Sequence, residues 1–113
     1  MWLMLSDSFL SIVCKDCRDD ELLVRARRRG DIEKVFPKAK VRRTPKGDYL
    51  FRSAIKKDDV IAAMENEVRR IDYGNFKDSV VDQHLHDAYL RVWATMLSLQ
   101  PAQRKSTRYV GSI

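Results

Sequence analysis

The chain has 113 residues, of which 44% are hydrophobic and 34% are charged, so we expect one packed domain rather than a disordered chain. Its net charge of +6 is uneven: residues 1–57 hold 15 Lys and Arg against 8 Asp and Glu, and residues 58–113 hold 7 against 8. A basic half favours an anionic partner. The apolar start ends at Asp7, too early for a signal peptide or a membrane span, so we expect a cytoplasmic protein without a membrane partner.

The first third of the chain has the composition of an antiparallel meander. Residues 2–5 and 9–14 are rich in strand formers and are separated by a turn-forming Ser-Asp-Ser cluster. Residues 22–27 then alternate, which places Arg25 and Arg27 on the same face of a third strand. The pattern predicts three strands with a pair of arginines on one side.

Helix and turn signals follow in the middle of the chain. Asp31 can cap a helix of about two turns, which Pro37 ends. Residues 40–44 predict a short, charged edge strand. After a turn at residues 45–48, residues 49–55 alternate as a fifth strand.

Two longer helices are expected in the second half. The first is capped by Asp58 or Asp59 and carries an apolar stripe formed by Val60, Met64, Val68 and Ile71. The second begins near Asp82 and ends at Pro101. The residues between them, 72–78, predict a loop with two aromatic side chains.

The order βββ-α-ββ-α-α predicts an α+β fold, in which helices pack on one face of an antiparallel sheet of about five strands. We expect a single domain over residues 1–100 and a flexible tail over residues 101–113. Trp2, Tyr89, Trp93 and the Met residues are expected in the core, with a homodimer interface as the alternative place for Trp93.

Two groups of side chains are candidates for binding. Arg25 and Arg27 suit phosphates or carboxylates, and an exposed Tyr49 or Phe51 beside them would make this face resemble RNA-binding sheets. The sequence has no RNP-type motif, however, and its expected strand order differs from that of the RNA-binding module. The alternative is a solvated face whose arginines pair with acids from the helices. The second group lies in the loop and consists of Asp72, Tyr73, Asn75, Phe76 and Lys77. Its rings could stack on a base or enter a partner's pocket, or could instead fix the loop to the core.

The sequence contains no complete catalytic or metal-binding motif. Cys14 and Cys17 form a C-x-x-C pair in a charged turn, which favours reduced thiols over a redox or zinc site. His86 is a further candidate binding residue, and pairing with Asp82 at the helix start is the alternative. We therefore expect no metal and no cofactor.

Four segments of the sequence form a recognisable set: the opening run over residues 1–13, the Leu-Leu-Val-Arg-Ala-Arg segment with Gly30-Asp31, the run Ile-Asp-Tyr-Gly-Asn-Phe-Lys-Asp-Ser-Val, and residues 86–93. These segments resemble a family of short bacterial proteins whose activity is uncharacterised. The resemblance covers residues 1 to about 99. It implies a bacterial or phage origin in the cytosol, and it implies no activity and no site residues.

Three functions are consistent with these residues. The leading hypothesis is a non-enzymatic binding or interaction module for a protein or an anionic partner, with a homodimer as one form. The alternative is a nucleic-acid-binding protein that uses the basic face of its sheet. The second alternative is a small enzyme in which Asp72, His86 and Arg25 share a pocket.

Overall fold

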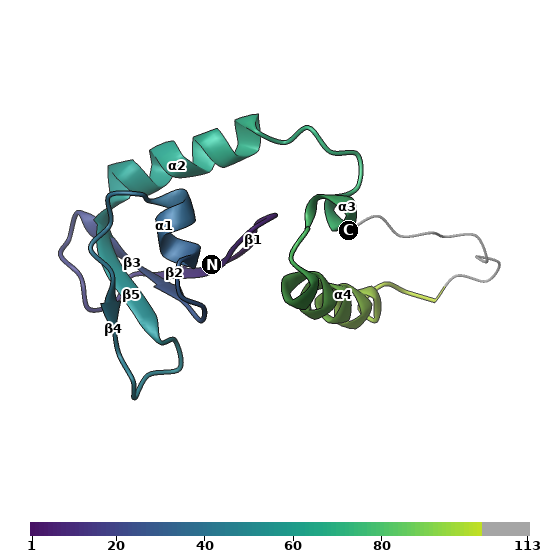
Figure 1. Cartoon of the computed structure of the whole chain (residues 1–113), viewed down its shortest axis with the longest axis horizontal. Helices are drawn as coiled ribbons and strands as arrows, with labels where there is room; N and C mark the ends of the chain where they lie inside the picture. Colours follow the sequence, from purple (N-terminus) through teal and green to yellow (C-terminus); the bar gives the residue numbers. More distant parts are fainter. Residues whose placement is uncertain (103–113) are drawn as a thin grey trace. The chain divides into compact units, whose positions relative to one another are not determined.

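The computed structural model of the chain describes residues 1–102 (Figure 1). The predicted tail lies outside the described residues from residue 103 onward. The described chain divides into two compact units, of which the first is Met1–Asp72 and the second begins at Tyr73. The single domain predicted over residues 1–100 stays a prediction. Within the described residues, no helix has the length and hydrophobicity of a membrane span.

The first unit is built on a five-stranded antiparallel sheet with the spatial order β1-β2-β3-β5-β4. The strands are β1 (Trp2–Met4), β2 (Phe9–Val13), β3 (Glu21–Ala26), β4 (Arg42–Arg43) and β5 (Phe51–Lys56). Figure 1 shows them from β4 at the left to β1 at the right. The predicted α+β class and the antiparallel sheet are confirmed.

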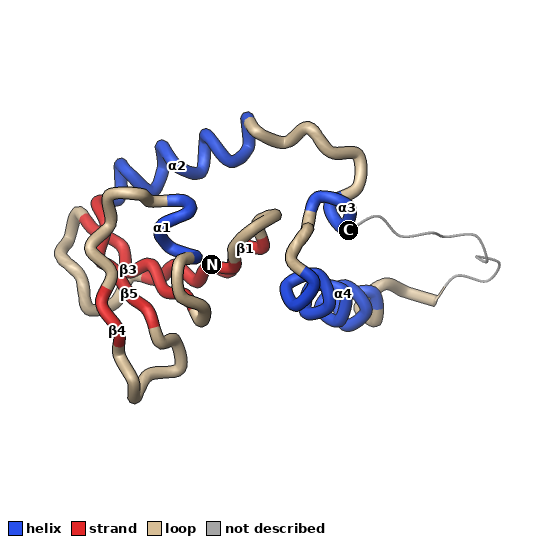
Figure 2. Tube along the Cα trace, in the orientation of Figure 1, coloured by secondary structure: helices blue, strands red, loops and turns tan. Residues whose placement is uncertain are grey.

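One face of this sheet carries the hydrophobic core. Its strand residues are neighbours on β2, β3 and β5: Leu10, Ile12, Val24, Ala26, Phe51 and Ile55. Two helices, α1 (Asp31–Val35) and α2 (Lys57–Arg69), lie on the same side of the sheet (Figure 2) and bury Ile32 and Val60 in this cluster. Removal of such side chains from water is the main stabilising contribution to the unit, at about 1.5–3 kcal/mol for each large one.

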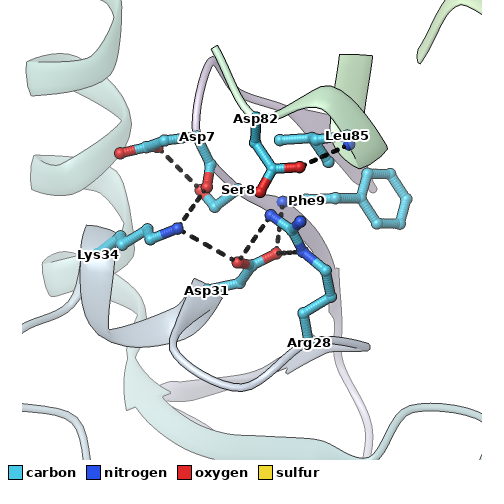
Figure 3. Close-up of polar contacts among 8 residues, drawn as sticks. All are labelled: Asp7, Ser8, Phe9, Arg28, Asp31, Lys34, Asp82 and Leu85. Carbon is cyan, nitrogen blue, oxygen red and sulfur yellow. Dashed lines mark hydrogen bonds and ion pairs between the residues drawn. The ribbon is translucent and has the colours of Figure 1, made fainter. Parts of the chain in front are cut away.

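Asp31 fixes α1 to the sheet instead of capping the helix. Gly30 occupies the N-cap position with a φ of +93°, a conformation that favours glycine. The Asp31 side chain is 2% exposed, and it accepts a hydrogen bond of 3.1 Å from the Phe9 backbone N–H (Figure 3). Its carboxylate also lies 3.4 Å from Arg28 Nη2 and 3.7 Å from Lys34 Nζ. The predicted cap is wrong because the Asp31 carboxylate accepts a hydrogen bond from the backbone of β2 and none from the first turn of α1.

Strand β5 runs directly into α2, so the predicted cap of that helix is also wrong. Lys56 is the N-cap residue, and Asp58 and Asp59 lie in the first turn, where carboxylates interact favourably with the helix dipole. The apolar stripe is only half buried. Val60 is 3% exposed, whereas Val68 is 67% exposed.

The second unit contains α3 (Phe76–Ser79) and α4 (Gln83–Leu97). Asp82 caps α4 by accepting a 2.9 Å hydrogen bond from the Leu85 N–H (Figure 3), which confirms the predicted start of that helix. The short helix α3 lies where the sequence predicts a loop. Asn75 provides its cap by accepting from the Lys77 N–H at 2.9 Å.

Candidate functional site

The face of the sheet opposite the core carries a line of neighbouring residues across all five strands. Residues paired in antiparallel strands project to the same side of the sheet. The pairs that make up the line join Trp2 to Ser11, Ser11 to Arg25, Arg25 to Arg52 and Arg52 to Arg42. We call Arg25, Arg52 and Arg42 the arginine row.

The charges of the arginine row are not balanced by carboxylates. Within residues 1–102, none of its three members forms an ion pair. On α2, by contrast, Arg69 lies 2.8 Å from Glu65, and Arg70 lies 3.1 Å from Glu67. Like charges directly opposite each other destabilise a sheet, so an anion bound to the row would relieve a repulsion that the protein itself leaves in place.

Arg25 is held in a defined position. Its Nη2 donates a 2.7 Å hydrogen bond to Ser11 Oγ, and its Cζ lies 4.5 Å from the centre of the Tyr49 ring. Its Nε is buried and has no hydrogen-bond partner in the described part of the chain. Because the guanidinium is already ordered, little conformational entropy would be lost if it bound a ligand.

The turn before β5 organises the neighbouring arginines. The Cζ of Arg27 lies 4.2 Å from the centre of the Tyr49 ring, and Arg27 Nη1 donates a 2.9 Å hydrogen bond to the Asp48 carbonyl. A Cβ built on Gly47 would lie 2.5 Å from Arg52 Nη2, so glycine leaves the space that this guanidinium occupies. The turn therefore packs against the arginine side chains of this face of the sheet, which we call the basic face.

Neither of the aromatic rings that the sequence offers for stacking on this face is exposed. Tyr49 is 4% exposed, because Arg25 and Arg27 cover its ring, and Phe51 lies in the core on the other face at 7%. Resemblance to RNA-binding sheets required an exposed ring at Tyr49 or Phe51, and neither residue provides one.

Trp2 is a surface residue that the sequence pattern misassigns. It is predicted in the core, yet the residue is 69% exposed. Its ring contacts Phe9 edge to face, with 5.9 Å between the ring centres. The signal that could have found it is the alternation in β1. Leu3 packs against the core, so its neighbours Trp2 and Met4 must project to the opposite face.

The aromatic residues of the 72–77 segment contact one another. The Tyr73 and Phe76 ring centres are 5.7 Å apart, and Phe76 stacks on Tyr89 of α4 at 5.5 Å. These contacts, together with the Asn75 cap, give the segment a structural role in the second unit. Binding by this segment, including Lys77, stays a prediction.

The residues proposed for an enzyme are distributed over both units. Arg25 and the exposed Asp72 belong to the first unit and His86 to the second, so their convergence stays a prediction. His86 Nδ1 lies 3.8 Å from Asp87 Oδ1. Cys14 and Cys17 are free thiols. Among residues 1–102, no three His, Cys, Asp or Glu side chains are close enough together to hold a metal ion.

A groove of about 1020 Å³ lies between α2, β5 and the segment that follows α1. Its lining mixes cationic and acidic side chains: Lys34, Lys38, Lys40, Lys56, Arg69 and Arg70 on one hand, and Glu21, Asp59 and Glu67 on the other. The sequence does not reveal this groove, because residues far apart in the chain form it. Its mixed charge favours no single class of ligand.

Comparison with protein-family models, curated proteins and solved structures finds no match to this chain. The family resemblance and the bacterial origin therefore stay predictions.

Proposed function

We propose that the chain is a non-enzymatic binding module that holds nucleic acid through phosphates placed on the arginine row. The observation that carries the proposal is the register of β3, β5 and β4. It lines up Arg25, Arg52 and Arg42 on one face, where no carboxylate of the described chain pairs with them.

The spacing of the row suits a chain of phosphates better than a single one. Neighbouring strands are about 4.8 Å apart, so the backbone positions of Arg25 and Arg42 are separated by ~10 Å. Guanidinium groups form paired hydrogen bonds with phosphate oxygens. Exposed Arg27 lies beside Arg25 and extends the positive surface along the sheet.

Fluorescence anisotropy with a labelled oligonucleotide tests the proposal. We expect Arg52→Ala to weaken binding by about tenfold, since one charge-assisted hydrogen bond contributes about 1.5 kcal/mol or more. The matched control is Arg69→Ala, which removes the same side chain and charge from α2, where Glu65 already pairs with it. This control should bind as the unchanged protein does.

The comparison of these two variants separates a site from general attraction. Equal losses in Arg52→Ala and Arg69→Ala would mean that only net charge matters, and the proposal would then be wrong. Absence of binding by the unchanged protein at about 50 mM salt, where electrostatic binding is strong, would also contradict it.

A further inference from the structure

We infer that Trp2 stacks on an unpaired base, and that the ligand of the basic face is therefore single-stranded nucleic acid. The inference rests on the proposed function, because the arginine row must hold the phosphates of the same strand. The positive charge of the surface specifies neither a role for Trp2 nor a preference for single strands over duplexes.

The position of Trp2 carries the inference. Trp2 pairs with Ser11, and Ser11 pairs with Arg25 and accepts its hydrogen bond, so Trp2 continues the line of the arginine row toward β1. Two strand spacings, ~10 Å, separate the backbone positions of Trp2 and Arg25. One nucleotide strand can therefore reach both residues.

The state of the Trp2 ring also suits stacking. Tryptophan is highly buried on average, but Trp2 is 69% exposed. Phe9 contacts it edge to face, with an interplanar angle of 70°. Such a contact stabilises one side of the indole and restricts its movement. A large, ordered and exposed ring beside a row of cations is the combination found in proteins that bind single strands.

Stacking selects single strands for a physical reason. In a duplex each base is already stacked and paired, so an outside ring can reach a base face only if the helix opens. An unpaired base has a free face at no such cost. A duplex would thus bind through its phosphates alone, whereas a single strand gains the contact with Trp2 as well.

Three probes test the inference on the full chain: labelled oligothymidylate, a labelled duplex of the same length, and inorganic polyphosphate as a polyanion without bases. We expect Trp2→Ala to weaken oligothymidylate binding by about 5- to 150-fold, the usual effect of removing one stacked aromatic side chain. Polyphosphate binding should not change. Trp2→Phe, which keeps a ring, should retain most of the affinity.

A spectroscopic measurement supplements the affinities. The chain has two tryptophans, so a Trp93→Phe variant leaves Trp2 as the single indole. Stacking on a base should quench its fluorescence when oligothymidylate is added, and polyphosphate should leave it unchanged. This measurement needs no substitution at Trp2 and does not depend on how Trp2→Ala folds.

Failure of the inference can be told apart from failure of the proposed function. If oligonucleotides and polyphosphate bind with a dependence on Arg52, but Trp2→Ala binds oligothymidylate normally or Trp2 is not quenched, the inference is wrong and the proposed function stands. Equal affinity for duplex and single strand would likewise overturn the inference alone. If no probe binds, both are wrong.

Discussion

Arg25 illustrates how single residues on the basic face differ from ordinary surface charges. An exposed arginine usually moves freely in water and contributes little to stability or specificity. Arg25 is instead half-buried, bonded to Ser11 and placed over Tyr49. These contacts order the guanidinium, and within residues 1–102 no carboxylate pairs with its charge.

We expect Arg25→Lys to separate geometry from charge. Lysine keeps the positive charge but lacks the planar, forked donor group and its stacking on Tyr49. Anisotropy should show binding weakened by about tenfold, the equivalent of one charge-assisted hydrogen bond, with the same dependence on salt. A lysine variant that binds as tightly as the unchanged protein would show that the fixed guanidinium has no particular role.

Asp31 is the residue whose buried charge we expect to matter for folding. Asp31→Ala leaves the Phe9 N–H without its acceptor and should lower the free energy of unfolding by about 2 kcal/mol. Its cationic neighbours, Arg28 and Lys34, are 36% and 45% exposed, so water can compensate them in part. Urea titration gives the value.

Exposed Glu33 on the same helix provides the control for Asp31. Glu33→Ala should change the free energy of unfolding by less than about 0.5 kcal/mol, as is usual for surface substitutions. If the two variants are equally stable, the carboxylate of Asp31 is not what holds α1 to the sheet.

At the scale of elements, α2 is a helix whose apolar stripe is only partly used. Val60 lies in the core cluster, while Val68, two turns later, is 67% exposed. The stripe predicts the helix correctly, but periodicity alone does not tell how far along the helix the sheet extends. In any helix that is longer than the sheet it covers, an apolar stripe can therefore continue into residues that are exposed.

The same substitution at these two valines tests the assignment. Val60→Ala should lower the free energy of unfolding by about 2 kcal/mol, because it leaves a cavity in the core, and Val68→Ala should change it by less than about 0.5 kcal/mol. Urea titration of both variants is sufficient. A larger loss at Val68 than at Val60 would contradict the described packing of α2.

The register of the strands explains which parts of the site are predictable. Alternation places Arg25 and Arg27 on one side of β3, because neighbours along a strand follow a local rule. Nothing local shows that Arg52 lies opposite Arg25, or that Arg42 lies opposite Arg52. These pairs depend on β5 lying between β3 and β4, which is a property of the whole sheet.

The helix starts show the same limit. Helix α4 begins next to Asp82 as predicted, and Asp82 caps it through a contact over three residues. Asp31 has an equally good local pattern, but its carboxylate bonds to Phe9, 22 residues away. The predicted place of Trp2 is wrong because its residue type suggests the core, whereas its face of β1 is set by pairing with β2.

At the scale of the whole first unit, the arrangement of charge matters more than its total. Residues 1–72 hold 17 Lys and Arg against 13 Asp and Glu, a net charge of only +4. Several of the acids are already engaged with cations of the helical side, as with Asp31, Glu65 and Glu67. The arginine row has no such partner within residues 1–102, so three positive charges lie side by side without a carboxylate although the net charge of the unit is modest.

The dependence of oligothymidylate affinity on salt tests the central claim most directly. Each phosphate contact on a single strand contributes about −0.7 to the slope of log affinity against log salt. Replacement of Arg25, Arg42 and Arg52 by alanine together should therefore make the slope less steep by about 2, while the variant lacking Arg69 and Arg70 keeps the slope of the unchanged protein. If the triple variant keeps the original slope, the arginine row does not bind phosphates.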